Sequence, residues 1–279
     1  MSPIVLSQPS AVETWREAVR AVDAEPAHEA HNVMLCVADP TAGAELADPR
    51  VALVDDFLRP HKKSVRTISN TIFPEGLYRR HGAPELFDAF HDKVLPTVRT
   101  NGRWSGYYFE RMTDWPNAPM GNPLWDIVTR MRDPTVRSNN KFELALFDPA
   151  RDTTRSPYGG QCLSFLSFKL LPGSPKKVAL TAMYRNHFYI EKLLGNLIGL
   201  GQLMAFVAKE TDQDVGPLTV ISSHAVIDLP KTRCGGKTTR TDLSALLKDY
   251  DALPATADQA NSANGSVASG PSAIVGASP

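Results

Sequence analysis

The sequence predicts an α+β fold in which a mixed sheet packs against one long buried helix. Segments 162–170 and 177–184 are apolar and rich in strand-forming residues, and the Leu-Pro-Gly-Ser-Pro-Lys run between them is typical of a turn. Apolar residues then recur at helical spacing over 187–209, and segment 218–229 is again rich in strand formers. The order strand, strand, long helix, strand favours a sheet that this helix covers.

Shorter elements follow from the same patterns. Helical spacing predicts further helices at 10–22, 83–98 and 124–131, and β-rich or alternating patterns predict strands at 31–38 and 141–147. Ser10 is a suitable N-cap for the first helix, because its hydroxyl can accept a bond from the first turn. Asp133 and Pro134 end the third helix, since proline cannot continue one.

Charge and cysteine content exclude several classes of protein. The 279 residues include 30 lysines and arginines and 30 aspartates and glutamates, so the formal net charge is zero and no large positive field attracts nucleic acid. The three cysteines, Cys36, Cys162 and Cys234, fit neither a disulfide framework nor a zinc site, which suits a reducing cytosol and predicts no metal. The most apolar stretch, 193–208, is too short to span a membrane, so we expect a cytoplasmic protein without membrane contact.

The composition changes sharply near the C-terminus. From Ala255 onward the chain carries a single charge, Asp258, and consists mostly of small and polar residues. Such a segment buries too little apolar area to offset the entropy of ordering it. The sequence therefore predicts one domain over 1–252 and a disordered tail over 253–279.

Two residues on the central strands are candidates for chemistry. Cys162 follows a Gly-rich turn and opens an apolar strand, where it is either a nucleophile whose pKa a nearby cation lowers or a small buried hydrophobe. Arg185 ends a strand just before a helix, where it either binds an anion such as phosphate or forms a surface ion pair.

The long apolar helix and the strand after it hold further polar candidates. Asn196 lies inside the helix and must find partners, either on a ligand or on nearby backbone, and the glycines around it favour close packing of the helix on a sheet. His224 lies in a β-rich run, where a histidine is more often a satisfied core residue than a catalytic one. His187 could pair with Cys162 in a thiol-enzyme dyad.

In their order along the chain, these segments resemble the thymidylate synthase superfamily. That family carries an Asp-Pro-x-Ser-Arg-Arg loop, a Pro-Cys-His nucleophile, a Tyr-Gln-Arg-Ser motif, an Asn eleven residues after that Arg, and a His-x-Tyr motif. The matching segments are 133–138 with Arg137 and Ser138, Gln161-Cys162-Leu163, Tyr184-Arg185, Asn196 at eleven residues beyond, and His224-Ala225-Val226. Segment 102–111, which includes Tyr108, is similar to the family's Gly-Pro-Val-Tyr-Gly run, and the resemblance covers about half the chain.

The resemblance implies a role for each matched side chain. Cys162 would add to C6 of a pyrimidine nucleotide monophosphate and make C5 a nucleophile toward a one-carbon donor. Arg185 would hold the 5′-phosphate and help to lower the thiol pKa. Asn196 would bond the pyrimidine edge, and His224 would touch the ribose hydroxyl.

The resemblance also implies a thymidylate-synthase-like fold whose sheet packs at a homodimer interface. Arg137, with Ser138 beside it, would reach across a two-fold axis to the phosphate bound by the partner. The donor would be 5,10-methylenetetrahydrofolate. The family's acidic base would fall at Asn70 or Glu75, and Tyr108 would belong to the pocket.

Several positions depart from the family pattern. Leu163 stands in place of the His after the nucleophile, and Ser138 in place of the second Arg of the loop. Val226 replaces the Tyr of the His-x-Tyr motif, and Phe188 replaces an Asp that helps orient the pterin. These changes remove contacts to the sugar and to the folate.

Three functions remain open at the level of sequence. The first is methylation or hydroxymethylation of a pyrimidine nucleotide at C5, with Asn196 favouring uracil over cytosine. The second is a nucleotide-binding or structural paralogue of the same fold without turnover. The third is an unrelated thiol enzyme that uses Cys162 with a histidine.

Overall fold

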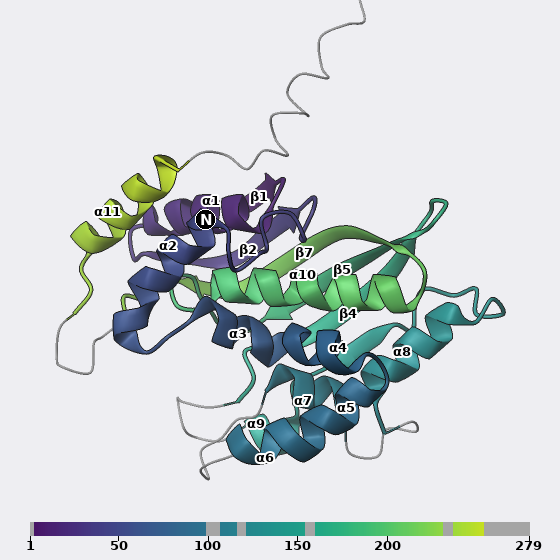
Figure 1. Ribbon diagram of the computed structural model, residues 1–279. Coiled ribbons are helices and arrows are strands. Elements are labelled where there is room, and N and C mark those ends of the chain that lie inside the picture. The colour runs from purple at the N-terminus through teal and green to yellow at the C-terminus, as the bar shows by residue number, and fades with distance from the viewer. Residues whose placement is uncertain (1–2, 99–106, 116–120, 154–159, 231–236, 254–279) are drawn as a thin grey trace, which may run out of the picture.

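A computed structural model describes residues 3–98, 107–115, 121–153, 160–230 and 237–253 (Figure 1). This part of the chain is a mixed α/β fold with an open sheet, and helix α10 (Leu193–Glu210) runs along one face of that sheet. The predicted tail, apart from Leu253, lies outside the described residues, as do residues 102–106 of the segment with the weakest resemblance.

The sheet is mixed, as the sequence predicts. Its strands are β1 (Val5–Gln8), β2 (Glu29–Val37), β3 (Glu143–Ala145), β4 (Leu163–Leu171), β5 (Lys177–Tyr184), β6 (His187–Phe188) and β7 (Asp214–Val226). They lie in the order β1-β2-β7-β5-β4-β3, with β6 beside β7. The β1–β2, β5–β7 and β6–β7 pairs are parallel and the others antiparallel. The five strands expected from the sequence are all confirmed.

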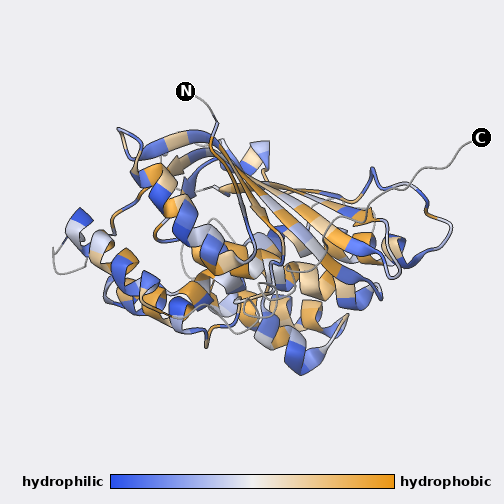
Figure 2. Cartoon of the chain, turned by 90° about the horizontal axis from the view of Figure 1, so that it is seen from above, coloured by the Kyte–Doolittle hydropathy of each residue, from blue (hydrophilic) through white to orange (hydrophobic). Residues whose placement is uncertain are grey.

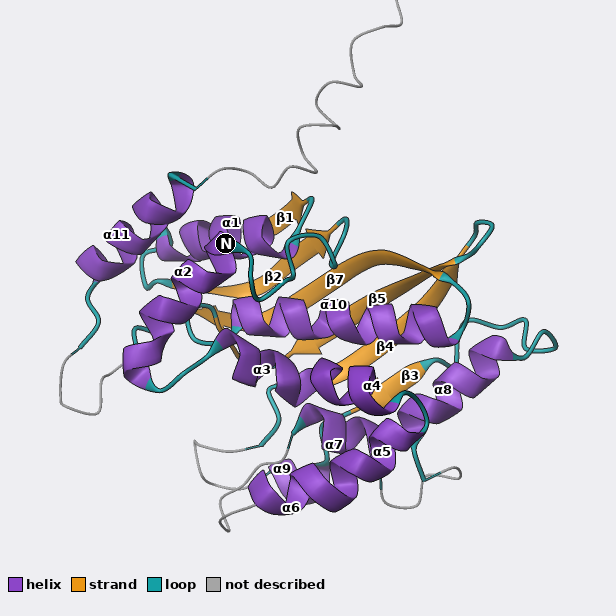
Figure 3. Cartoon of the chain, viewed as in Figure 1, coloured by secondary structure: helices purple, strands orange, loops and turns teal. Residues whose placement is uncertain are grey.

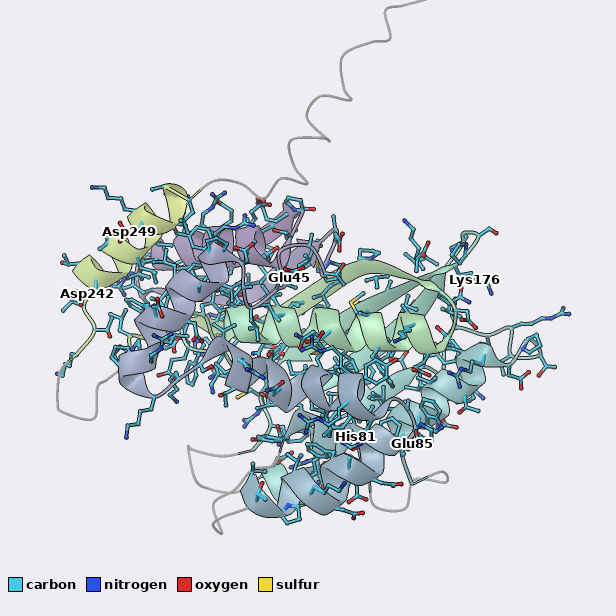
Figure 4. The ribbon with its side chains drawn as sticks, viewed as in Figure 1. Glu45, His81, Glu85, Lys176, Asp242 and Asp249 are labelled. Carbon is cyan, nitrogen blue, oxygen red and sulfur yellow. The ribbon has the colours of Figure 1, made fainter. Side chains whose placement is uncertain are left out.

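The helices cluster on one side of the sheet. The sheet is seen nearly edge-on in Figure 2 and lies behind the helices in Figure 3. They are α1 (Ala11–Asp23), α2 (Pro49–Leu58), α3 (Val65–Ile72), α4 (Glu75–His81), α5 (Glu85–Ala89), α6 (Leu95–Val98), α7 (Tyr108–Thr113), α8 (Pro123–Arg132), α9 (Pro149–Asp152), α10 and α11 (Arg240–Asp251). Ser10 caps α1 as predicted, and the helix expected at 83–98 consists of α5, a π-helical turn at Phe90–Val94 and α6. Charged side chains such as Asp242 and Asp249 of α11 project outward (Figure 4).

Helix α10 is buried over most of its length, as expected, but it begins later than predicted. Residues 187–188 pair with β7 as strand β6 instead of starting the helix. Asp228 accepts backbone N–H bonds from Ile190 and Glu191 at 2.9 and 3.1 Å, which holds the intervening turn. None of the helices in the described part of the chain has the length and apolar character needed to cross a bilayer.

Glycines bring α10 close to a helix rather than to the sheet. A Cβ atom at Gly195 would lie 2.7 Å from the Ile68 side chain, and one at Gly199 would lie 2.8 Å from the carbonyl oxygen of Ser69. Both contacts are with α3. The expectation that these glycines pack on a sheet is therefore wrong, and their effect is to hold α3 beside the first half of α10.

The two faces of the sheet differ in burial. Leu35, Val220, Ala182 and Leu166 form one register-aligned row across four strands and are fully buried beneath the helices. The adjacent row on the opposite face is also apolar but is not covered: Val5, Met34, Met183 and Phe165 are exposed, and Ile221 is partly exposed. Of these, Met183 is 41% exposed and Phe165 37%. We refer to these five residues as the open-face row.

Candidate functional site

A cavity of about 230 Å³ lies where β4 begins, β5 ends and α10 begins. It brings together three of the residues expected from the sequence, Cys162, Asn196 and Tyr108. His187 and Lys192 also line it. The site residues that come from separate motifs in the sequence therefore meet because α10, α7 and the central strands converge at this point.

Backbone pairing places Arg185 next to the cysteine. The backbone N–H of Arg185 donates to the carbonyl oxygen of Cys162 at 2.9 Å. The Nε of Arg185 donates to the carbonyl oxygen of Gln161, also at 2.9 Å. Gly160 has a φ of +72°, and a Cβ atom there would lie 3.0 Å from Arg185 Nη2, so a side chain at this position would strain the loop and crowd the guanidinium.

Burial dominates the acidity of the thiol. It raises the pKa of Cys162, and the nearby charges of Arg185 and Lys192 lower that pKa by less. Arg185 thus lowers the thiol pKa as expected, but burial outweighs it. Because the ordinary thiol pKa is already above neutrality, Cys162 is protonated at pH 7 until something else in the reaction takes its proton.

A buried hydrogen-bond network lies behind Asn196. Its Nδ2 donates to His187 Nε2 at 2.9 Å, and His187 Nδ1 lies 3.0 Å from Ser222 Oγ. The hydroxyl of Tyr189 donates to the same Oγ at 3.3 Å. Burial lowers the pKa of His187 to about 3, so its imidazole is neutral at physiological pH. The sequence indicated the amide but carried no signal for Ser222 or Tyr189.

Neither histidine is free to serve as a base for the cysteine. The ring nitrogens of His187 are bonded to Asn196 and Ser222. Those of His224 contact Asn186 Oδ1 at 2.8 Å and Glu29 Oε2 at 2.9 Å. The thiol-enzyme dyad considered from the sequence is therefore not formed.

His224 lies just outside the cavity. It does not line the cavity, but its partner Asn186 does. Its ring stacks on that of His31 with centroids 5.0 Å apart. Asn186 therefore lies between His224 and the cavity.

Two tyrosines line the cavity, and the environments of their hydroxyls differ. Burial raises the pKa of Tyr108, and the nearby Cys162 raises it further. Tyr184 is fully buried, stacks on His187 with ring centroids 4.0 Å apart, and has a buried hydroxyl that finds no hydrogen-bond partner among the described residues. A buried polar group left in this way costs free energy, which a polar atom of a ligand would recover.

Lys192 is a functional candidate that sequence reasoning missed. It caps α10 and lines the cavity, and burial together with the charge of Lys63 lowers its pKa. Glu191 and Asp228 oppose that shift, and Lys63 pairs with Glu191 at 3.1 Å. Burial raises the pKa of Asp228 itself to about 7. The only feature of the sequence that could have indicated Lys192 is its position just before the apolar run at 193–208.

The two candidates for the general base lie elsewhere. Asn70 and Glu75 line a second cavity of about 420 Å³ between α3, α4 and the π-helical turn. Glu75 there accepts a bond from Gln202 at 3.4 Å and lies 3.8 Å from Arg79. Helix α3 instead presents Ile68 and Thr71 to the cysteine cavity, and none of the described residues that line that cavity is Asp or Glu.

The remaining candidates lie outside the cavity or differ from the family pattern. Arg137 and Ser138 are exposed in the loop between α8 and β3, where the Ser138 hydroxyl bonds to Asn140. Leu163 is fully buried in the core. Phe188, which the resemblance aligns with an Asp of the thymidylate synthase superfamily, forms part of the cavity wall and is 38% exposed.

No protein-family description and no curated protein matches this chain. Among the described residues, no group of three or more His, Cys, Asp or Glu side chains is arranged to hold a metal ion. The cavity is therefore interpreted from its own residues: a thiol, an adjacent guanidinium, an amide held by a neutral imidazole, and an unpartnered tyrosine hydroxyl.

Proposed function

We propose that the chain binds a pyrimidine nucleotide monophosphate in this cavity and activates C5 for one-carbon transfer through a covalent Cys162 adduct. The observation that carries the proposal is that Cys162 and Asn196 line one cavity and that Arg185 is bonded to the backbone of residues 161 and 162. Arg185 does not itself line the cavity, but its neighbours Gln161 and Cys162 do, so a phosphate at the edge of the cavity next to these two residues would be near its guanidinium. The buried hydroxyl of Tyr184 supports a polar ligand there.

The chemistry proceeds at the pyrimidine. Cys162 loses its proton to solvent, and its sulfur forms a bond to C6 while the C5–C6 π electrons shift toward C5 and O4. C5 then takes up an electrophile, a proton or a one-carbon unit. Loss of the C5 hydrogen as a proton and departure of the thiolate restore the ring. Methylation needs a hydride at the exocyclic carbon, whereas hydroxymethylation needs water.

The donor that the resemblance implies, 5,10-methylenetetrahydrofolate, has little polar support in the described cavity. Phe188 stands where a carboxylate would orient the pterin, and none of the described lining residues is acidic. These residues do not fit the pterin, so no step is assigned to it. Hydroxymethylation tolerates such a remodelled folate site better than methylation does, since it needs no hydride.

A second copy of the chain is the partner we propose for the open face of the sheet. The open-face row is apolar across five strands, whereas its neighbours Ser7, Thr219 and Thr181 form a polar row on the same face. Packing two such faces would bury the exposed apolar side chains. Arg137, exposed in the loop that leads into the edge strand β3, would then be available to the partner's nucleotide.

A non-catalytic paralogue is the alternative, and it has its own support. The thiol pKa is raised, and none of the described residues lining the cavity is a carboxylate base. A protein with these features could hold the nucleotide without turning it over.

Exchange of the C5 hydrogen with solvent separates the two functions. Pyrimidine monophosphates labelled at C5 with tritium are incubated with the wild-type protein, with Cys162→Ala, and with Cys36→Ala as a matched control on β2. The proposal expects tritium release by the wild type and by Cys36→Ala, and none by Cys162→Ala. Binding without release from any pyrimidine monophosphate would establish the paralogue instead.

A further inference from the structure

Four buried side chains form a continuous chain behind the cavity, from Asn196 through His187 and Ser222 to Tyr189. The three contacts measure 2.9, 3.0 and 3.3 Å. Asn196 is 3% exposed, His187 1%, and Ser222 and Tyr189 0%. Only Asn196 and His187 line the cavity, so the other two residues act from behind it.

The partners assign a proton to each position in this chain. The Nδ2 of Asn196 is only a donor, so His187 Nε2 is the acceptor and its neutral ring carries the proton on Nδ1. That Nδ1–H donates to Ser222 Oγ, which also accepts from the Tyr189 hydroxyl. Because burial lowers the pKa of His187 to about 3, the ring is neutral near physiological pH.

The proton on Nδ1 ties the carboxamide of Asn196 to its present orientation. With this tautomer, a rotation by half a turn would place Oδ1 against the bare Nε2 of His187, so that two acceptors would face each other in a buried site. The amide could turn over only if the ring proton moved to Nε2 and Ser222 Oγ donated to Nδ1, so His187 and Ser222 together determine the order of Oδ1 and the second N–H. An amide free to rotate would offer either order to a ligand.

We propose that His187 is a positioning residue that holds Asn196 in one orientation and thereby makes the site select one pyrimidine edge over the other. This inference rests on the proposed pyrimidine function. Uracil presents an N3–H donor beside an O4 acceptor, and cytosine presents an N3 acceptor beside an N4 donor. A fixed amide matches one of these edges, whereas on the other edge it places donor against donor and acceptor against acceptor. Uracil is the base expected for Asn196. A site that leaves buried polar groups unpaired with the wrong ligand discriminates strongly.

The test compares Kd values for uridine and cytidine monophosphates by calorimetry in three variants. His187→Phe keeps a ring against Tyr184 but removes both nitrogens, and Ser222→Ala removes the acceptor for Nδ1–H without lining the cavity. His187→Gln supplies an acceptor oxygen in place of Nε2. His81→Phe, at the end of α4 (Figure 4), is the control for a histidine-to-phenylalanine change.

The wild type and His81→Phe are expected to prefer uridine monophosphate by at least about tenfold, the usual effect of one mismatched buried hydrogen bond. His187→Phe and Ser222→Ala should bring the two Kd values to within about threefold, mainly by tighter binding of the cytidine nucleotide, and His187→Gln should restore part of the preference. In parallel, ¹⁵N NMR of the ring should show a protonated Nδ1 and a bare Nε2 in the wild type.

An unchanged ratio in Ser222→Ala and His187→Phe, or a protonated Nε2 in the wild type, would overturn the inference. Should His187→Phe fail to fold, Ser222→Ala and the NMR spectrum of the wild type still decide it. Binding of neither nucleotide by the wild type would refute the proposed function itself, which separates that failure from a failure of the positioning role.

Discussion

Arg185 and Cys162 are joined by a backbone hydrogen bond of 2.9 Å at the point where the end of β5 pairs with the start of β4. The guanidinium then turns back over the same loop, where its Nε bonds to the carbonyl oxygen of Gln161. Strand pairing therefore places the two residues side by side, and the bond to Gln161 holds the guanidinium near the thiol. Substitutions at Arg185 and Cys162 can therefore measure what each side chain contributes to binding and to thiol reactivity.

Arg185→Ala should weaken binding of the nucleotide without affecting the base. A charge-assisted bond to phosphate contributes about 1.5–3 kcal/mol, so the Kd for a pyrimidine monophosphate should rise by about 10- to 100-fold. The Kd for the matching nucleoside, which lacks the phosphate, should change little. Calorimetry with both ligands checks this, and an equal loss for nucleoside and nucleotide would show that Arg185 does not contact the phosphate.

Tyr184→Phe should have opposite effects on stability and on binding. The substitution removes a buried hydroxyl that has no partner, so the free energy of unfolding of the empty protein should rise by about 1 kcal/mol. If the ligand satisfies that hydroxyl, the Kd for the nucleotide should rise by about tenfold, which corresponds to about 1.4 kcal/mol. Urea unfolding and calorimetry measure the two quantities. A variant that is less stable yet binds as well as the wild type would contradict the account.

The reactivity of Cys162 should depend on both nearby cations. In a Cys36→Ala/Cys234→Ala background, the rate of alkylation by iodoacetamide should rise with pH, with a midpoint above the ordinary thiol pKa, because burial raises the pKa of Cys162. Arg185 and Lys192 both lower this pKa, so Arg185→Ala and Lys192→Met should each move the midpoint to higher pH. A midpoint near pH 7 in the parent protein would show that the cations outweigh burial.

His187 should make the protein lose stability in acid. The unfolded chain takes up a proton on this histidine below about pH 6.5, whereas the folded protein does so only near pH 3. The contribution of His187 is therefore fully present above pH 6.5 and falls by about 1.4 kcal/mol per pH unit as the pH drops from 6.5 toward 3.

Comparison with His187→Phe isolates this slope. Asp228, whose pKa is raised to about 7, contributes stability that is lost as pH rises from 3.8 to 7, and it does so equally in both proteins. The difference in unfolding free energy between wild type and His187→Phe, measured in urea from pH 4 to 8, should shrink toward low pH and be flat above pH 7. A difference that does not vary with pH would show that His187 is not held neutral.

The sequence was sufficient for the elements with strong local patterns and for residues adjacent to them. The turn at 171–176 and the apolar runs on either side of it predict β4 and β5, and the alternation at 141–147 predicts the edge strand β3. Cys162 and Arg185 follow because they lie at strand ends. The start of α10 could not be predicted, because residues 187–188 look helical until β7 is present to pair with them.

The polar contacts of the cavity depend on contacts that no local pattern contains. Ser222 lies 35 residues after His187 and reaches it only through the pairing of β5 and β6 with β7. The two candidates for a base lie in another cavity for a similar reason: which face of α3 points at Cys162 is determined by the close approach of Gly195 and Gly199 to that helix. Thr71 and Ile68, rather than Asn70, therefore line the cavity.

Mass spectrometry of the protein with 5-fluorouridine or 5-fluorodeoxyuridine monophosphate tests the central claim most directly. Fluorine at C5 cannot leave as a cation, so an adduct between Cys162 and C6 that has taken up the one-carbon unit cannot complete elimination and should persist when that unit is supplied. The account predicts that the peptide containing Cys162 gains the mass of the nucleotide, with or without the one-carbon donor attached, and that Arg185→Ala reduces its yield. A Cys162 peptide of unmodified mass, in a sample that contains the one-carbon unit and that calorimetry shows to be saturated with the nucleotide, would contradict it.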